Sequence, residues 1–130
     1  MGAAESTSPD ELDTVVREVV LDAGPEAVWD VLTDGDARRA WLDDDADRPV
    51  RVDDAVRYQR LVWTWWDDDG APSRVTITLT PSVSGTVLRV VERLTIEAPQ
   101  ARAAAGAAGA AWDRRTLGLE LLLLDLAVLV

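Results

Sequence analysis

Hydrophobic and polar residues alternate over several short stretches of the chain, which is the pattern of strands that bury one face. The clearest stretch is residues 74–80, RVTITLT, where Val75, Ile77 and Leu79 share one side and arginine and threonines share the other. Looser alternation runs through residues 14–21, 50–66 and 86–96. The range 50–66 is long enough for two strands, so five antiparallel strands are predicted.

Two adjacent aspartates, Asp53 and Asp54, interrupt the alternation within residues 50–66. Aspartate is common in turns and is depleted in strands. We therefore predict a turn near these two residues, with one strand before it and one strand after it.

Apolar residues recur at helical spacing in two short segments and again at the end of the chain. Residues 25–33, PEAVWDVLT, carry an apolar stripe behind a proline that suits the first turn of a helix. Residues 34–42 predict a second short helix, with Asp34 or Asp36 available as its N-cap. From Pro99 onward an alanine- and leucine-rich sequence predicts one long helix, and the charges within it argue against a membrane span.

Composition limits the chemistry of the chain. Its 130 residues suit one domain, and residues 1–12 are polar enough to predict a disordered N-terminal lead. The chain contains no histidine and no cysteine, so it lacks an imidazole base, a thiolate nucleophile and an ordinary zinc site, and no cofactor or metal is expected. The net charge of −11 argues against nucleic-acid binding. The N-terminus has no secretion signal, which predicts a cytoplasmic protein.

Several segments, in this order, resemble the START-like superfamily, also called SRPBCC. They are REVVLDAGPEAVWDVLTD at 17–34, AWL at 40–42, RLVWTWW at 60–66, SRVTITLTP at 73–81, GTVLRVVER at 85–93 and AWDRRTLGLE at 111–120. Within this superfamily the chain is most similar to proteins named for the Aha-type activator of the heat-shock protein 90 ATPase. The resemblance implies an α+β helix-grip fold, in which a curved antiparallel sheet wraps around a long C-terminal helix and two short helices follow the first strand. It also implies a single START-like domain over residues 13–130.

The superfamily includes lipid and hormone carriers, polyketide cyclases and co-chaperones, so the resemblance leaves three functions open. The first is non-catalytic binding of a small hydrophobic or aromatic ligand between the sheet and the C-terminal helix. The second is a polyketide cyclase/aromatase-like reaction, and the third is a co-chaperone-like module that docks a chaperone or client protein. Relatives usually carry more sequence than residues 43–59 at that place, which implies a stunted sheet edge where a homodimer could form.

Tryptophans are the first candidates for ligand-binding residues. Alternation places Trp63 and Trp65 on one face of their strand, together with Leu61. Trp41 and Trp112, on the predicted helices, are expected to join them. The indoles either pack as an ordinary core or form the walls of an apolar pocket that holds a flat ligand.

Glu92, Arg17 and Tyr58 are the polar candidates. Strand alternation puts Glu92 on an apolar face, where an unpaired carboxylate is costly. In a helix-grip fold the first and last strands are neighbours, so Arg17 and Glu92 are predicted to pair, either as structure or as a polar anchor or acid/base in a pocket. Tyr58 either lies on a solvated face or adds a polar contact at the pocket mouth, whereas Arg114 and Arg115 are predicted to be surface charges.

Overall fold

The computed structural model describes residues 14–42, 47–66, 72–94 and 98–129. Residues 1–13, which include the predicted lead at 1–12, and residues 43–46, 67–71, 95–97 and 130 lie outside the described residues. The predicted division into a lead and a single domain therefore stays a prediction.

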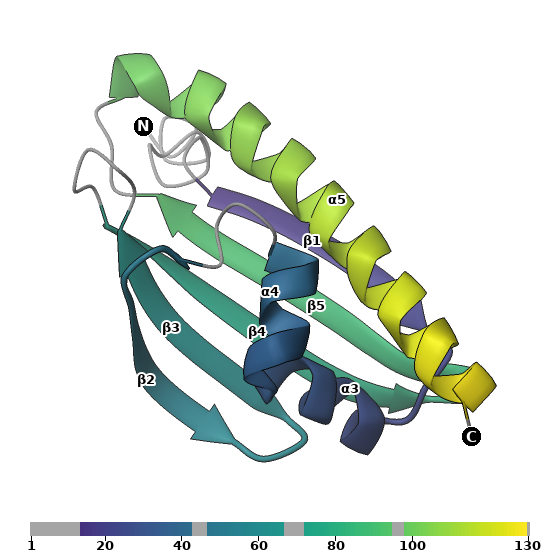
Figure 1. Ribbon diagram of the computed structural model, residues 1–130. Coiled ribbons are helices and arrows are strands. Elements are labelled where there is room, and N and C mark those ends of the chain that lie inside the picture. The colour runs from purple at the N-terminus through teal and green to yellow at the C-terminus, as the bar shows by residue number, and fades with distance from the viewer. Residues whose placement is uncertain (1–13, 43–46, 67–71, 95–97, 130) are drawn as a thin grey trace.

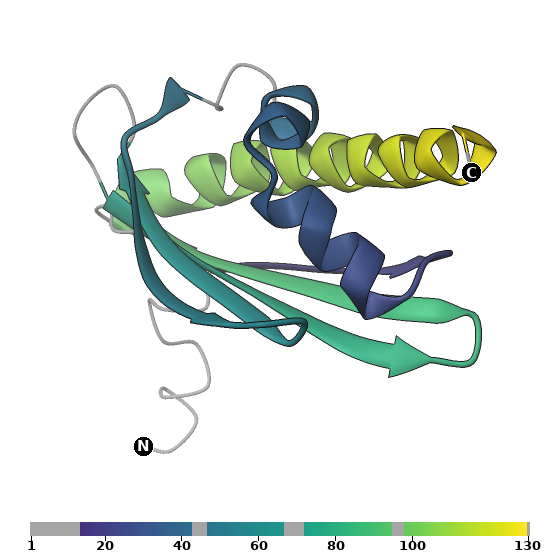
Figure 2. The same ribbon diagram turned by 60° about the horizontal axis from the view of Figure 1, so that its bottom comes forward.

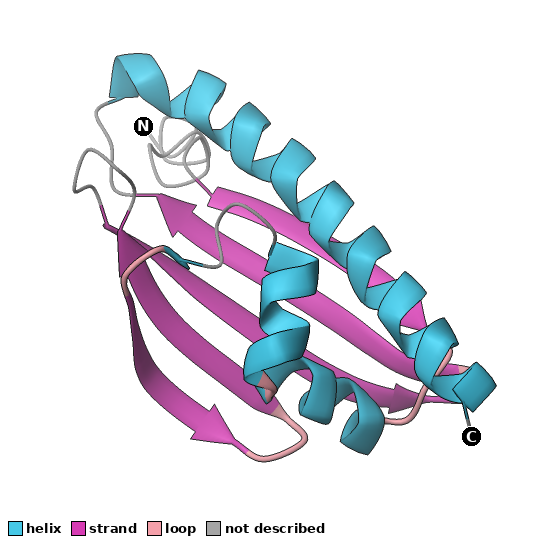
Figure 3. Cartoon of the chain, in the orientation of Figure 1, coloured by secondary structure: helices cyan, strands magenta, loops and turns pink. Residues whose placement is uncertain are grey.

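Five strands form one antiparallel sheet in the order β1-β5-β4-β3-β2 (Figures 1 and 3). The strands are β1 Thr14–Leu21, β2 Val50–Val56, β3 Arg60–Trp66, β4 Pro72–Ser82 and β5 Gly85–Leu94. The helices are α3 Pro25–Thr33, α4 Gly35–Leu42 and α5 Ala98–Leu129. All three helices lie over the same face of the curved sheet, as the turned view shows (Figure 2). The predicted α+β helix-grip fold is confirmed.

The inner face of the sheet follows the predicted alternation. Val75 and Ile77 on β4 are fully buried, and Leu88 and Val90 on β5 are buried beside them. Arginine and threonines on β4, and arginines and valines on β5, alternate with these residues and point to the other face, so the central strands bury one side more fully than the other.

The two short helices meet at one residue, Asp34. Its backbone N–H donates to the carbonyl of Asp30 at 2.9 Å and closes α3, while its Oδ2 accepts from the backbone N–H of Ala37 at 2.8 Å and caps α4. Of the two predicted N-cap candidates, Asp34 is therefore the cap. The shared residue makes the junction short and sets the direction of α4 over β3.

The predicted turn at Asp53 and Asp54 is wrong. Both residues lie within β2, and the turn comes at residues 57–59, where Gln59 N donates to Val56 O at 2.9 Å. Asp53 is an extra residue in β2, because the pairing with β3 shifts between Val52 and Asp54.

Neighbouring side chains explain how β2 tolerates these aspartates. Arg51 Nε and Thr64 Oγ1 donate to Asp53 at 2.8 and 2.6 Å, and Arg60 pairs with Asp54 at 2.7 Å. The hydrogen bond from Thr64, followed by that from Arg51, lowers the pKa of Asp53. Side chains of β2 and β3 thus pair with both aspartates within the strand.

Candidate functional site

Four of the six tryptophans form one buried cluster, which we call the tryptophan cluster: Trp41 on α4, Trp63 and Trp65 on β3, and Trp112 on α5. None of the four is more than 2% exposed. Trp112 is the centre, with its ring centroid 6.3 to 6.4 Å from each of the other three. The cluster therefore fills the space between α4, β3 and the middle of α5.

Glu92 lies beneath this cluster and is 2% exposed. Its Oε1 accepts from Trp112 Nε1 at 2.8 Å, and its Oε2 accepts from Trp65 Nε1 at 2.9 Å and from Ser73 Oγ at 2.6 Å. Donors from β3, β4 and α5 thus converge on the carboxylate of this β5 residue. These bonds supply the partners that a buried carboxylate requires.

The predicted pair between Arg17 and Glu92 is wrong. The register of β1 and β5 places Val15 opposite Glu92, whereas Arg17 lies opposite Val90. Arg17 is instead drawn to α5, where its Nε donates to Asp113 Oδ1 at 2.8 Å. Arg17 lies on the predicted face of β1, but α5 crosses that face and brings the carboxylate of Asp113 closer to Arg17 than that of Glu92.

Gly109 gives Arg17 its place under α5. A side chain on Gly109 would collide with the Arg17 guanidinium, so the missing Cβ leaves the space that this group occupies.

Cations cover the faces of the same indoles that donate to Glu92. The Arg115 guanidinium carbon lies 4.6 Å from the Trp112 ring centroid and 5.1 Å from that of Trp65. The guanidinium carbon of Arg48, which precedes β2, lies 3.9 Å from the ring centroid of Trp65. A cation over the negative face of a ring and an acceptor at its positive edge are both favourable, so the arrangement is matched in charge.

Arg115 was predicted to be a surface charge, and this is wrong, because it is only 6% exposed. Arg114 is exposed, as predicted. The signal that could have found Arg115 is helical spacing, since it follows Trp112 by three residues and precedes the buried Leu119 by four, on one helix face.

A cleft lies beside the tryptophan cluster, between the two short helices and strands β2 and β3. It has a volume of about 230 Å³ and is half-open. Its lining residues, which define the Arg38 cleft, are Trp29, Leu32, Thr33, Arg38, Val50, Val52, Ala55, Leu61 and Trp63. Apolar side chains make most of this surface, with Trp29 and Trp63 supplying two aromatic walls.

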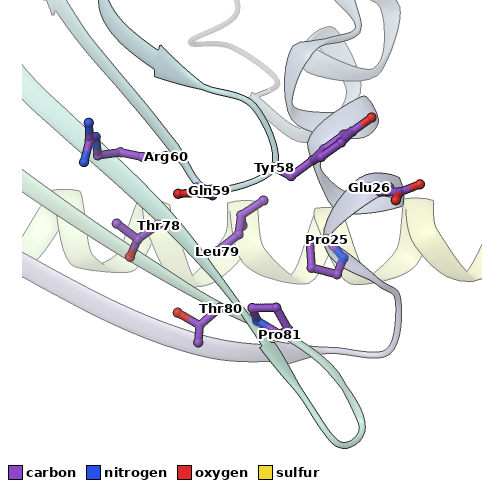
Figure 4. A pocket seen from close by; sticks show the side chains of 9 residues that line it. All are labelled: Pro25, Glu26, Tyr58, Gln59, Arg60, Thr78, Leu79, Thr80 and Pro81. Carbon is purple, nitrogen blue, oxygen red and sulfur yellow. The ribbon is translucent and has the colours of Figure 1, made fainter.

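A wider cleft of about 620 Å³ lies near the turn between β2 and β3. It is lined by Pro25, Glu26, Tyr58, Gln59, Arg60, Thr78, Leu79, Thr80 and Pro81 (Figure 4). Tyr58 lies at its edge against the start of α3, with its ring edge-on to Trp29 at 6.4 Å. Tyr58 also has a φ of 68°, a left-handed backbone conformation that costs free energy in a residue other than glycine.

A third cleft, of about 160 Å³, lies between the end of β1 and the later part of α5. Its lining residues are Val20, Asp22, Glu120, Leu123 and Leu124.

The predicted site residues thus divide among different places. Trp63 lines the Arg38 cleft and Tyr58 lines the wider one. Trp41, Trp65, Trp112 and Glu92 lie in or under the tryptophan cluster, and Arg17 lies at the contact of β1 with α5. A ligand-binding role for these residues stays a prediction. Arg38, which sequence reasoning did not select, is the charged residue that lines the Arg38 cleft.

The described residues contain no group of three or more aspartate, glutamate, histidine or cysteine side chains that could hold a metal ion. Within the same residues, no helix is both long and apolar enough to cross a membrane.

Solved structures share this fold. Protein MLL2253 from Mesorhizobium loti is 29% identical, and the match covers 86% of this chain and 96% of that one with a TM-score of 0.73. DynU16, from the dynemicin biosynthetic locus, is 21% identical over 85% of this chain and 47% of its own, with a TM-score of 0.72. The Aha1 dimer from Colwellia psychrerythraea is 15% identical over 82% of this chain and 92% of its own, with a TM-score of 0.68. At their identities, the last two show the fold alone.

No curated protein matches the chain. A family model does match, over residues 42–123, which is well over half of the sequence. The matched range runs from the end of α4 through β2 to β5 and into α5, so it includes Glu92 and most of the tryptophan cluster. The predicted START-like, Aha-type resemblance is confirmed, and the chain belongs to the family described as activator of Hsp90 ATPase homolog 1-like protein.

Proposed function

We propose that this protein binds a small apolar or aromatic molecule, without transforming it, in the Arg38 cleft. The observation that carries the proposal is a half-open cleft of about 230 Å³ whose walls are mostly apolar and include two indole rings. Concave, largely apolar surfaces with few polar groups are typical of small-molecule sites. The cleft lies next to the short helices, whereas the space under the middle of α5 holds the tryptophan cluster.

The size of the cleft limits the ligand. Pockets for drug-sized molecules have volumes of roughly 300 to 1,000 Å³, and the Arg38 cleft is smaller than that range. A ligand of one or two fused rings fits better than a lipid or an extended polyketide.

The enzyme hypothesis has less support. It uses Glu92 or Tyr58 as the proton carrier, but Glu92 lines none of the three clefts and its oxygens already accept three hydrogen bonds. Tyr58 lines the wider cleft only. A bound substrate in the Arg38 cleft would thus touch neither group, and the cyclase-like and co-chaperone-like functions remain alternatives.

We also propose that two copies of the chain associate as a homodimer through the edge strand β2. β2 is at the edge of the sheet, and its pairing with β3 leaves its other side without a strand among the described residues. Exposed edges of this kind can pair with a second copy. One relative with the same fold, Aha1 from Colwellia psychrerythraea, is described as a dimer.

The test is to fill the cleft. Ala55 lies on β2, is exposed and lines the cleft, so Ala55→Phe should occupy the ligand's place without disturbing the buried core. We expect tryptophan emission of the wild type to change saturably with naphthalene-sized ligands, and Ala55→Phe to abolish this change. Val83→Phe, at an exposed hairpin position, is the control and should bind as the wild type does. Equal binding by Ala55→Phe and wild type would place the ligand elsewhere, and an absence of binding by wild type would contradict the proposal.

A further inference from the structure

The Arg38 cleft has a charge that is opposite to that of the whole chain. The sequence contains 24 acidic and 13 basic residues, yet the described residues that line the cleft include one arginine and no aspartate or glutamate. An acidic protein surface repels small anions at long range. A local cation without carboxylates around it is the feature that would recognise an anion at short range.

Arg38 is held where its guanidinium is partly withdrawn from water. It lies on α4, which Asp34 caps, and is half-buried against the cleft wall. Burial lowers the pKa of the Arg38 guanidinium, because the charged form loses hydration. A partly buried charge is normally offset by a partner, since its lost hydration is otherwise uncompensated.

No described residue supplies that partner. Arg17, Arg51 and Arg60 each form an ion pair with an aspartate, but Arg38 forms none within the described part of the chain. Its one aromatic contact is with Trp63, whose ring centroid is 6.0 Å from the guanidinium carbon. This distance is at the outer limit for a cation over a ring, so the contact is weak compensation.

The indole of Trp63 has an unused donor as well. Trp63 is 2% exposed, and its Nε1 has no hydrogen-bond partner among the described residues. A buried indole N–H usually finds an acceptor. Within the tryptophan cluster, Trp65 and Trp112 do so, with Glu92 as the acceptor, whereas Trp41 Nε1, like Trp63 Nε1, has no partner among the described residues. The wall of the cleft therefore carries a cation that has no ion-pair partner among the described residues, and an anionic ligand would supply one.

We propose that the ligand of the Arg38 cleft is a small aromatic acid whose carboxylate pairs with Arg38 while its ring packs between Trp29 and Trp63. This inference rests on the proposed function and specifies the class of ligand. A planar carboxylate can accept two parallel, charge-assisted hydrogen bonds from the fork of donors on a guanidinium. A neutral ligand cannot form such a charge-assisted pair.

The experiment compares two probes that differ in charge and share their shape, 2-naphthoic acid and 2-naphthamide. Binding of each is measured by calorimetry with the full chain. We expect the acid to bind about tenfold to a hundredfold more tightly than the amide, which is the usual effect of a hydrogen bond to a charged group. Arg38→Gln should remove this preference and leave the affinity for the amide unchanged.

Two further variants separate the role of Arg38 from a general effect of charge or folding. Arg39→Gln removes the same charge from the next residue of α4, which is exposed and does not line the cleft, and it should keep the preference for the acid. Arg38→Lys keeps the charge but not the planar fork, and it should restore part of the preference. Near-ultraviolet circular dichroism checks that every variant keeps its tertiary packing.

The outcomes distinguish this inference from the function on which it rests. Equal affinity of the wild type for acid and amide would overturn the inference and leave apolar binding in place. A preference for the acid that survives in Arg38→Gln would overturn the assignment of Arg38. Binding of neither probe would contradict both the inference and the proposed function.

Discussion

The tryptophan cluster and the Arg38 cleft share Trp63, but they differ in whether the protein supplies partners for the charged group of each region. In the cluster, the carboxylate of Glu92 has three donors, and Arg115 lies on two of the indoles that surround it. In the cleft, Arg38 has no ion-pair partner and Trp63 Nε1 has no acceptor among the described residues. The difference indicates that the protein itself supplies the partners of the charged group in the cluster, whereas the charged group of the cleft has no ion-pair partner among the described residues.

The largest effect on the free energy of unfolding is expected when Trp112, the centre of the cluster, is replaced. Trp112→Ala removes a fully buried ring that contacts three others and takes one donor from Glu92. We expect the free energy of unfolding to fall by about 3 to 5 kcal/mol in urea denaturation. The control is Leu117→Ala, an exposed position of α5, which should change it by less than about 0.5 kcal/mol. A small effect at Trp112 would show that the cluster does not hold α5 to the sheet.

A smaller effect is expected when Glu92 becomes an amide. Glu92→Gln keeps the shape of the side chain. Its amide nitrogen is a donor, however, and must lie against an N–H or O–H group that in the wild type donates to the carboxylate. We expect a loss of about 1 to 3 kcal/mol in unfolding free energy, and no change in ligand affinity, since Glu92 does not line the Arg38 cleft. Glu18→Gln, at an exposed position of β1, is the matched control. Lost ligand binding in folded Glu92→Gln would instead favour the enzyme-like hypothesis.

Replacing each region's arginine with methionine gives the direct comparison. Arg115→Met removes the cation from the faces of Trp65 and Trp112, and we expect a loss of about 1 to 2 kcal/mol. Arg38→Met removes a half-buried charge that has no ion-pair partner among the described residues, so without ligand it should change stability by less than about 0.5 kcal/mol. Thermal denaturation of the two variants measures the contrast. If Arg38→Met is the more destabilising, Arg38 is part of the structural core and not a binding group.

The smallest effect on the free energy of unfolding is expected at Asp53 of β2, the strand that forms the outer wall of the cleft. The hydrogen bonds of Asp53 lower its pKa, so it adds stability at pH values above the unfolded pKa of about 4 and loses this contribution as pH falls through the folded value. The difference in unfolding free energy between the wild type and Asp53→Asn should therefore be largest near pH 7 and shrink in acid. Asp30→Asn, an exposed aspartate of α3, controls for the loss of one charge. A difference that does not depend on pH would mean that the carboxylate's charge is not what holds β2.

Much of the fold could be predicted because it depends on local patterns. Strand alternation correctly placed Val75, Ile77 and Leu79 on the buried face, and it placed Glu92 there too. The two short helices and the long one followed from apolar spacing, proline and capping aspartate. The turn between β2 and β3 was misplaced. Arg51 is a local partner of Asp53, but Thr64 and Arg60 come from β3, and this pairing across strands cannot be read from the local sequence.

The sequence by itself determined which face of the central strands is buried, since period and parity along a strand are local properties of the backbone. Only the tertiary structure decided which side chains meet. Arg17 reaches Asp113 and not Glu92, and Arg115 lies against two indoles, because strand register and the phase of α5 over the sheet result from packing across the whole molecule. For the same reason Arg38, an ordinary residue of a short helix in the sequence, becomes the charged group of the cleft only after α4 is placed above β3.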